Sequence, residues 1–336
     1  MKKLLVSCLI LLMMTFVTGV ALASDVDDYV GSETCKTCHS SKYKEWKGSR
    51  HSQMIRKAKE ENIVGNFTSD DADLTFDKDD AVYVIGGKWK QRYITKKDGH
   101  YYILPAQWIV KTQEWKPYHA NNWEERPWSK KCMGCHTTGA RPADAIPDKE
   151  NAGKVQPFAE TSVGCESCHG AGQEHVKTMD PEKIVNPKDL SRGQKVSICG
   201  SCHNRGKHVD GYYGYPYGFE PGDIVEDIYN PTTADKRWWE VKGKDAANKW
   251  WDDKADADLL LEKSHHQQYL GFLQSEHNEA GLTCSSCHDV HLDLEKQNVA
   301  QKCVDCHMPK TAKSATPGDI RTHTFKTQKD YNELNK

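Results

Sequence analysis

The hydrophobic and polar positions of this 336-residue chain first separate a short apolar block from everything that follows. Lys2 and Lys3 precede a mostly apolar stretch from Leu4 to Val17, and Ala21 and Ala23 form a small-x-small site. This order is typical of a secretory signal and predicts cleavage after Ala23. The stretch is shorter than the ~20 residues of a membrane-spanning helix. A retained anchor is therefore the weaker alternative, and the mature chain is expected not to span a membrane.

The next distinct pattern is strand-like and lies between residues 65 and 130. The segment AVYVIGGKWKQRYITKKDGHYYILPAQWIV alternates in hydrophobicity, and Asp98-Gly99 separates two arms rich in Tyr and Ile. An Asp-Gly pair between such arms is a strong hairpin signal. The sequence therefore predicts a small antiparallel β excursion here.

Two later segments differ from it. Residues 211–255 are rich in Gly, Pro, Tyr and Trp and are expected to form an irregular surface connection. Residues 256–279 place Leu259, Leu260, Leu270 and Leu273 on one face at helical spacing, which predicts a long amphipathic helix.

Six copies of Cys-x-x-Cys-His change this picture most. Two intervening residues place both sulfurs on one side of a helical turn, and the following histidine is positioned to ligate a metal. The pattern is the attachment signature of a c-type haem. The six copies predict six covalently attached haems, whose iron ligands include His39, His136, His169, His203, His288 and His307. The cysteines that hold them are Cys35, Cys38, Cys132, Cys135, Cys165, Cys168, Cys199, Cys202, Cys284, Cys287, Cys303 and Cys306.

The cysteine count excludes the competing classes. Of the 13 cysteines, 12 belong to the motifs, and the last, Cys8, lies in the expected signal. Cys8 precedes most of the apolar stretch, which argues against a lipoprotein site. No cysteine remains for a disulfide scaffold or a thiolate nucleophile, and a zinc ribbon or a thioredoxin-like pair does not require six copies ending in His.

Motif spacing divides the chain into six segments. They are a signal peptide (1–23), an N-terminal haem module (24–64), a hairpin-containing insertion (65–130), a three-haem segment (131–210), an irregular connection (211–255) and a C-terminal two-haem segment with the long helix (256–336). Without Lys2 and Lys3, 44 basic side chains face 48 acidic ones, a net charge of −4. This balance gives no indication of a nucleic-acid partner.

Several segments resemble the multihaem cytochromes c of the c-552/4 type. They are GSETCKTCHSSKYKEWKGSRHSQM, CMGCHTTG, VGCESCHGAGQEHV, HHQQYLGFLQSEH with TCSSCHDVH, and CVDCHMP with IRTHTF. The resemblance implies a mainly α-helical and irregular fold, with short helices around closely packed haems and a small antiparallel β excursion. It also implies mostly two histidine ligands for each iron. It does not fix one substrate, because the family contains carriers and reductases.

The second ligand of each iron decides between those two classes, because a second protein ligand closes the iron to small molecules. The matching motifs favour His51, His175, His277, His291 and His323, with one of His265 and His266. His291 follows His288 too closely to serve the same iron, so a neighbouring haem is its expected target. Helical geometry leaves the choice between His265 and His266 open. His100, His119 and His208 are expected to be structural or exposed, and the methionines to be packing residues.

We expect an exported electron carrier, located in the periplasm or outside the cell. Its expected partners are other redox proteins: quinol-linked or outer-membrane cytochromes, or terminal reductases. One alternative is an oxidoreductase acting on a small nitrogen or sulfur species at one five-coordinate haem. All six motifs end in His, and the Lys-ended variant that resembles the nitrite reductase active site is absent. Another alternative is a subunit of an oligomer or extracellular cytochrome filament, in which His51 reaches a haem of the neighbouring subunit.

Overall fold

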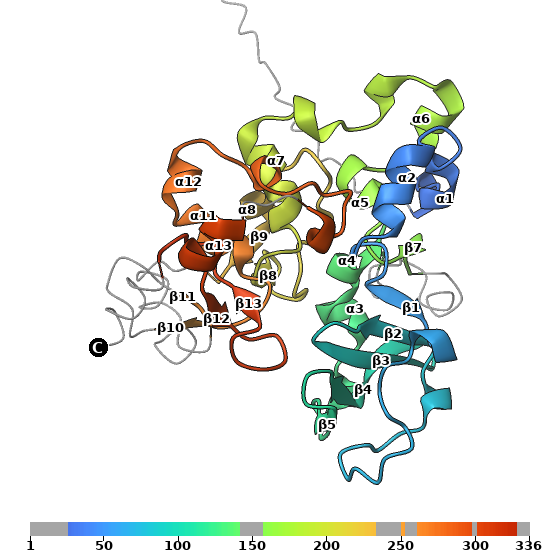
Figure 1. Ribbon diagram of the computed structural model, residues 1–336. Coiled ribbons are helices and arrows are strands. Elements are labelled where there is room, and N and C mark those ends of the chain that lie inside the picture. Colours follow the sequence, from blue (N-terminus) through green and yellow to red (C-terminus); the bar gives the residue numbers. More distant parts are fainter. Residues whose placement is uncertain (1–25, 142–156, 233–249, 253–260, 298–300, 328–336) are drawn as a thin grey trace, which may run out of the picture.

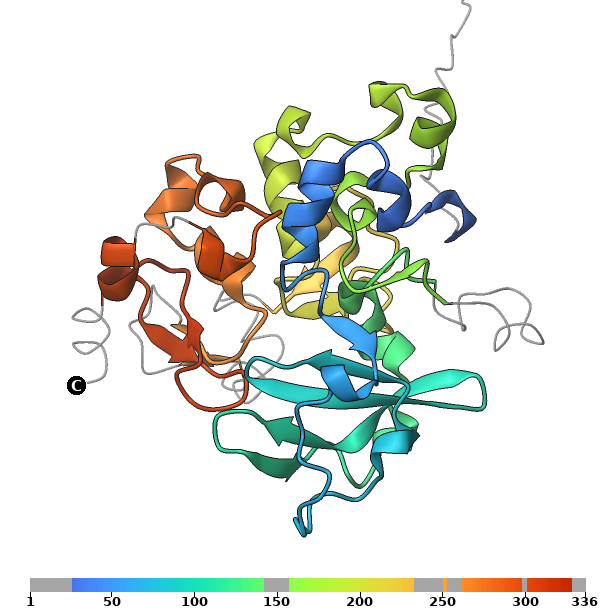
Figure 2. The ribbon, with the colours of Figure 1, turned by 45° about the vertical axis from the view of Figure 1, so that its right-hand side comes forward.

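The computed structural model describes residues 26–141, 157–232, 250–252, 261–297 and 301–327. A five-stranded antiparallel sheet forms one end of the molecule, and short helices joined by long loops form the other (Figure 1). Seen from the side in Figure 2, the sheet lies below the helices, and the C-terminal segments lie beside both. Within the described ranges, no helix has the length and apolar content needed to cross a membrane.

The helices are short throughout the described chain, and the longest has nine residues. A helix this short is marginal in isolation, so its stability depends on what it packs against. The α-helices are α1 (Ser32–Cys35), α2 (Ser40–Lys47), α3 (Trp128–Lys131), α4 (Met133–His136), α5 (Glu166–His169), α6 (Gln173–Thr178), α7 (Arg192–Gly200), α8 (Val225–Ile228), α11 (Gln268–Leu273), α12 (Glu276–Glu279) and α13 (Gln301–His307).

The main sheet follows chain order from β1 to β5, with every neighbouring pair antiparallel. Its strands are β1 (Ile55–Lys57), β2 (Tyr83–Gly86), β3 (Lys90–Lys97), β4 (His100–Ile109) and β5 (Glu114–Pro117). Four two-stranded ladders pair β6 (Thr137–Thr138) with β7 (Glu160–Thr161), β8 (Gly206–His208) with β9 (Tyr229–Pro231), β10 (Trp251–Asp252) with β11 (Leu261–Glu262), and β12 (Lys310–Ala312) with β13 (Ile320–Arg321).

The predicted hairpin is confirmed as the connection between β3 and β4. Lys97 pairs with His100, and both intervening residues have positive φ, 51° at Asp98 and 80° at Gly99. Positive φ at both central positions is what a type I′ turn requires, and Asp-Gly satisfies it. The sheet has five strands and is larger than the small excursion expected. Its first strand, β1, begins at Ile55, inside the segment assigned to the N-terminal haem module.

The sheet buries both of its faces, and this explains its strongly apolar strands. One face carries Tyr93, Trp108 and Trp115, which pack against the loop containing Phe67 and Phe76. The opposite face carries Ile94 and other apolar residues that pack against Trp128 of α3 and Met133 of α4. Since α4 contains part of the second Cys-x-x-Cys-His motif, the sheet is a support for that motif.

Two sequence-based expectations are wrong. Residues 261–279 do not form one long helix: they form β11, a turn, α11 and α12, while Leu259 and Leu260 lie outside the described residues. His266 has φ of 63°, which a continuous right-handed helix does not contain. The connection at 211–255 is not confined to the surface either. Its aromatic side chains Tyr213, Tyr215, Tyr229 and Trp251 are buried.

Candidate haem-binding site

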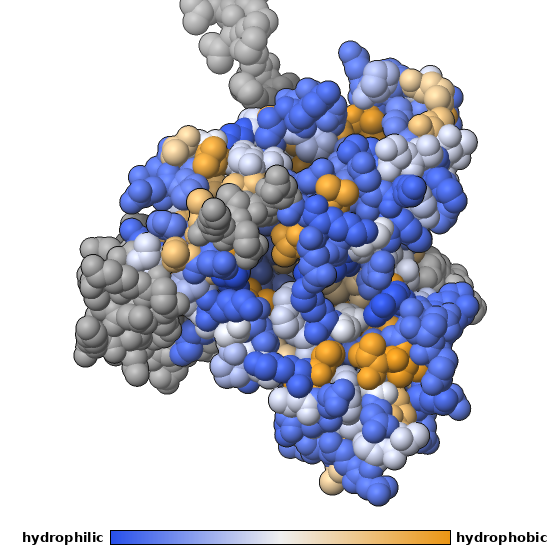
Figure 3. All heavy atoms as spheres, in the orientation of Figure 1, coloured by the Kyte–Doolittle hydropathy of each residue, from blue (hydrophilic) through white to orange (hydrophobic). Residues whose placement is uncertain are grey.

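A large cavity runs between the sheet and the helices, with a volume of about 3120 Å³. Small-molecule pockets usually measure about 300–1,000 Å³, so this cavity has room for several cofactors. The cysteines and histidines of the first five motifs line it. Most of the face shown in Figure 3 is hydrophilic.

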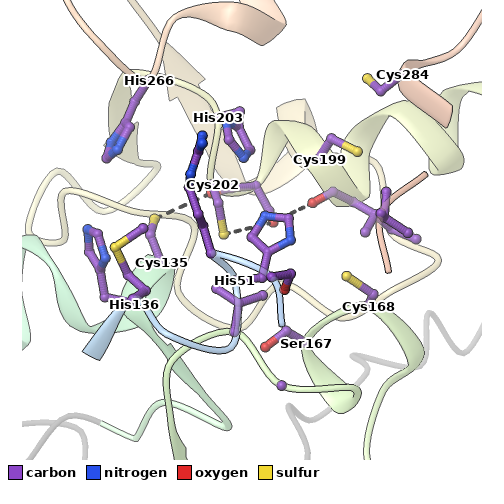
Figure 4. A pocket seen from close by; sticks show the side chains of 18 of the residues that line it. His51, Cys135, His136, Ser167, Cys168, Cys199, Cys202, His203, His266 and Cys284 are labelled. Carbon is purple, nitrogen blue, oxygen red and sulfur yellow. Dashed lines mark hydrogen bonds between the residues drawn. The ribbon is translucent and has the colours of Figure 1, made fainter. Parts of the chain in front are cut away.

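Each motif forms the helical turn that its spacing predicts. In the first, third, fourth and fifth motifs the histidine amide donates to the carbonyl of the first cysteine, at 2.9, 3.1, 2.8 and 3.0 Å. The second motif continues into α4, and the sixth lies within α13. Figure 4 shows side chains from the second, third, fourth and fifth motifs converging in one part of the cavity, together with His51 and His266.

Five of the six motif histidines face a second histidine from a distant part of the chain. The separations between ring centres fall in a narrow range. They are 6.3 Å for His39–His175, 6.2 Å for His51–His203, 5.9 Å for His136–His266, 6.4 Å for His169–His291 and 6.4 Å for His288–His323. Among the described residues, no three His, Cys, Asp or Glu side chains converge as a metal-binding group. His203 also lies 6.5 Å from His266, so the pairs of the second and fourth motifs adjoin each other.

This separation fits two imidazoles on opposite sides of one metal ion. A metal–nitrogen bond of about 2 Å on each side, plus about 1 Å from each nitrogen to its ring centre, gives roughly 6 Å between ring centres. The Nδ1 atom of His136 is also buried without a partner in the described part of the chain. The residues present thus fit an iron held between paired histidines.

Hydrogen bonds at the other ring nitrogen support this fit. The Nδ1 atoms of His169 and His175 contact the backbone carbonyls of Val185 and Asp180, both at 2.8 Å. His288 makes the same kind of contact with Gln297 Oε1 at 3.2 Å, and His307 and His323 contact backbone carbonyls. A donor at Nδ1 leaves the lone pair of Nε2 available to a metal, the usual arrangement for a ligating histidine.

Burial keeps several of these imidazoles neutral. It lowers the pKa of His136, His203 and His323 to about 4 in each case, because the charged form loses its hydration. A neutral ring is the form that binds a metal, so no proton has to be displaced near neutral pH.

The adjacent pair His265 and His266 is separated by position. His266 faces His136, whereas His265 is engaged at both ring nitrogens. His265 Nδ1 lies 3.4 Å from the carbonyl of Lys313, and its Nε2 lies 3.2 Å from a guanidinium nitrogen of Arg205. The left-handed backbone of His266 turns the two rings in different directions, with an angle of 76° between them.

The sixth motif differs from the other five in its surroundings. Cys303, Cys306 and His307 are exposed, and the described lining of the cavity includes none of them. His307 Nδ1 lies 3.4 Å from the carbonyl of Phe325, and the phenyl ring of Phe325 stacks on His277 at 4.1 Å. Phe325 therefore brings His277 and His307 into one neighbourhood at the edge of the molecule.

Contacts between cysteines show which motifs are neighbours. The thiols of Cys35 and Cys165 lie in hydrogen-bonding contact, as do those of Cys135 and Cys202, and those of Cys199 and Cys284. The first motif is thus next to the third, the second next to the fourth, and the fourth next to the fifth. The fourth motif touches two others and lies at the centre of the arrangement.

The remaining histidines are His100, His119 and His208, of which the last two also line the cavity. His100 ends the hairpin turn, His119 packs edge-on against Tyr118, and His208 accepts the amide of Asp210 and contacts Tyr213. The expectation that these three histidines are structural or exposed stays a prediction.

Sequence reasoning missed several residues that shape the site. Glu166, the residue after Cys165, is buried and accepts three backbone amides. Lys90, Arg92 and Arg205 line the cavity near His136 and His266. The position of Glu166 inside a Cys-x-x-Cys motif was a possible signal for it, but residue patterns gave none for the three cations, because they meet only through the tertiary fold.

Comparison with known proteins gives the class. A family profile described as cytochrome c554 and c-prime matches residues 34–80 and 106–170. In solved structures, the outer cell wall cytochrome OcwA superposes with a TM-score of 0.69 and 26% identity, covering 91% of this chain and 82% of that one. The chain is a member of the multihaem cytochromes c, proteins with covalently bound haem c.

Two curated relatives lie in the same class. The chain is 24% identical over 198 residues to the cytochrome c nitrite reductase subunit NrfA of Nitratidesulfovibrio vulgaris (strain Hildenborough), covering 50% of this chain and 36% of that one. It is 25% identical over 193 residues to the multiheme cytochrome MtrA of Shewanella baltica (strain OS185), covering 53% and 52%. The chain thus matches about a third to a half of the length of these relatives.

Proposed function

We propose that this protein is an exported six-haem electron carrier in which every iron is held by two histidines. The observation that carries the proposal is the set of five histidine pairs separated by 5.9–6.4 Å. Covalently bound haem supplies a one-electron iron couple, and a second protein ligand keeps that iron from binding small molecules.

The proposed axial ligands follow from the pairs. His175, His51, His266, His291 and His323 stand opposite His39, His203, His136, His169 and His288. His277 is assigned to His307 because Phe325 joins their surroundings. His265 is excluded as a ligand because its two ring nitrogens already have protein partners.

The arrangement of the motifs supports electron transfer between surface sites. The first and sixth motifs are the most exposed, since His39, Cys38, Cys303, Cys306 and His307 all reach the surface. The second to fifth motifs line the cavity, and the first motif lines it as well. We assign the two exposed motifs as the places where redox partners exchange electrons with the protein.

Location and partners are part of the same proposal. The relatives include an outer cell wall cytochrome and a multiheme cytochrome, which supports a position outside the cytoplasm after signal cleavage near Ala23. The partners are other redox proteins of the cell envelope, such as quinol-linked or outer-membrane cytochromes or terminal reductases. The filament arrangement that uses His51 as a ligand for a neighbouring subunit is not favoured, because His51 faces His203 of its own chain.

Electron paramagnetic resonance of the oxidised holoprotein tests the proposal. We expect six low-spin haems for each chain, no stoichiometric high-spin signal, and an intact mass that exceeds the mature polypeptide by six haems. His266→Ala should convert one haem to high-spin and let it bind carbon monoxide. The matched variant His265→Ala should keep six low-spin haems.

The alternative is an oxidoreductase with one open iron. It would take the place of the carrier if the unmutated protein showed a stoichiometric high-spin haem that binds nitrite, hydroxylamine, sulfite or carbon monoxide. If His265→Ala, rather than His266→Ala, produced the high-spin haem, the ligand assignment would be wrong even if the carrier function held.

A further inference from the structure

A cluster of basic side chains lines the cavity beside His136 and His266. Lys90 and Arg92 are two residues apart on β3 and therefore project from the same face of that strand. Arg205 follows the fourth motif, and its Nε donates to the carbonyl of His265 at 2.9 Å. We call Lys90, Arg92 and Arg205 the cation cluster. All three line the cavity.

The cluster is held in place by neutral groups. Arg92 Nε donates to Gln107 Oε1 at 2.9 Å, and its guanidinium lies 3.7 Å from the centre of the Tyr118 ring. The Arg205 guanidinium lies 4.6 Å from the centre of the Trp250 ring and contacts His265. These contacts orient the charges without neutralising them.

Asp319, the carboxylate that acts on Lys90, already has other hydrogen-bond partners. Asp319 interacts with Lys90 at a distance, but its carboxylate accepts the amides of Ala315 and Thr316 and the hydroxyl of Thr316. Burial, with Arg92 and Arg205 nearby, lowers the pKa of Lys90 to about 7. Partly buried charges of one sign are costly without a counter-charge. A bound anion would therefore stabilise this corner of the cavity.

A covalently attached haem brings such an anion, because each porphyrin carries two carboxylates. The positive charges of Arg92 and Arg205 also reach the paired histidines. Beyond the effect of burial, Arg92 lowers the pKa of His136, and Arg205 lowers the pKa of His266. Positive charge near an iron favours its reduced form, which carries one positive charge fewer.

The opposite electrostatic environment surrounds the first and third motifs. Glu166 is buried there and Glu160 is partly buried. In addition to contact with Cys165 and burial, both carboxylates raise the pKa of the Cys35 thiol through their negative charge. Glu33 lies on α1 close to the same motif. Negative charge near an iron favours its oxidised form.

We propose that the cation cluster binds the carboxylates of the haem held between His136 and His266 and makes it the highest-potential haem of the protein. This inference rests on the proposed function, since it takes six haems with paired histidines as given. It adds a direction: electrons move from the acidic end, at the first and third motifs, towards the second motif, which the fourth motif adjoins.

Redox titration of the holoprotein, followed by visible absorbance and paramagnetic resonance, tests the inference. Arg92→Gln and Arg205→Gln should each lower the midpoint of the highest-potential haem and leave the others in place. We expect about a tenfold change in its oxidised-to-reduced ratio at fixed potential, which is about 59 mV for a one-electron couple. Arg92→Lys, which keeps the charge, should restore most of the midpoint, and Lys111→Gln, at an exposed turn, should change nothing.

The haem that responds is identified by a separate variant. His266→Met should raise the midpoint of the same component, because methionine ligation raises the potential of a histidine-ligated haem. If His266→Met moves a component other than the highest one, or if Arg92→Gln and Arg205→Gln both leave all midpoints unchanged, the inference is wrong. Six low-spin haems in those same samples would show that the proposed function still stands.

A further titration separates the porphyrin carboxylates from an anion of the solution. Acetate is exchanged for chloride at constant ionic strength. If the porphyrin carboxylates fill the cluster, the highest midpoint should not depend on acetate. A midpoint that follows the acetate concentration would assign the cluster to a dissolved anion and overturn the proposed binding.

Discussion

Glu166 provides the sharpest test of how the haem motifs are held together. Its side chain is 1% exposed, although it lies between two haem-attaching cysteines. Oε1 accepts the amides of Val30 and Gly172 at 2.9 and 2.7 Å, and Oε2 accepts the amide of Gly31 at 2.8 Å. Val30 and Gly31 directly precede α1, so one carboxylate joins the first motif to the third.

Glu166→Ala removes the acceptor of three backbone amides at once. A buried donor left without a partner costs about 1–3 kcal/mol, and bonds to a charged group lie at the upper end. Because the three share one acceptor and Val30 and Gly31 are only partly buried, we expect a total loss on the order of 3–5 kcal/mol. Glu166→Gln keeps one carbonyl oxygen for Val30 and Gly172 but turns an amide group towards Gly31, which should cost about 2 kcal/mol.

Guanidinium unfolding of the holoprotein, followed by far-ultraviolet circular dichroism, measures the loss. Amide hydrogen exchange locates it, with faster exchange expected at Val30, Gly31 and Gly172. Glu174→Ala is the control: this exposed residue on α6 pairs only with nearby groups, and its loss should stay within about 0.5 kcal/mol. A Glu166→Ala loss below about 1 kcal/mol, or equal losses for Ala and Gln, would refute the reasoning.

Three further changes test other parts of the molecule. Trp115→Ala opens a cavity in the aromatic core of the sheet and should cost about 3–5 kcal/mol by denaturant unfolding, while haem absorbance per chain stays constant; a loss of haem would contradict this. Gly134→Ala would place a methyl group 2.1 Å from the Tyr215 ring and should cost about 1–3 kcal/mol, whereas Gly48→Ala, with no contact closer than 3.5 Å, should cost less. Burial raises the pKa of the Glu160 carboxyl above its usual 4.5, so the free energy of unfolding should fall as the pH rises from 4.5 through the pKa of the folded state. Glu160→Gln should flatten this decline in unfolding experiments, and an unchanged slope would contradict the assignment to Glu160.

The features that could be predicted from the sequence are those set by short-range geometry. The Cys-x-x-Cys-His turns depend on bonds between residues four apart, so spacing alone indicates them. The Asp98-Gly99 turn depends on two backbone angles that this pair adopts readily. The sequence also proposes a set of second histidines, because each lies in a segment resembling those of the family, and their role as ligands stays a prediction.

The features that could not be predicted depend on contacts between distant segments. The long helix fails because a side chain competes with its backbone, since Gln267 accepts the amide of Ser264, and because Glu262 is held by a distant segment through the amide of His323. Helical periodicity could not separate His265 from His266, since Arg205 and Lys313 occupy the ring of His265 only in the folded chain. The aromatic residues of the irregular connection give no periodic signal, yet Tyr215 is buried against the second motif.

The interlaced histidine pairs have a consequence for the order of events during synthesis. In four of the five pairs the second histidine comes later in the chain than the motif it faces, as with His39 and His175 or His288 and His323. A chain that crosses a membrane with its N-terminus leading therefore presents these motifs before their partners emerge. The fourth motif finds its partner, His51, already present, and under the proposed assignment of His277 to His307 the sixth motif does so too. These motifs therefore wait for their second histidine until later segments arrive, and the C-terminal segment with His323, which follows β13, is among the last of them.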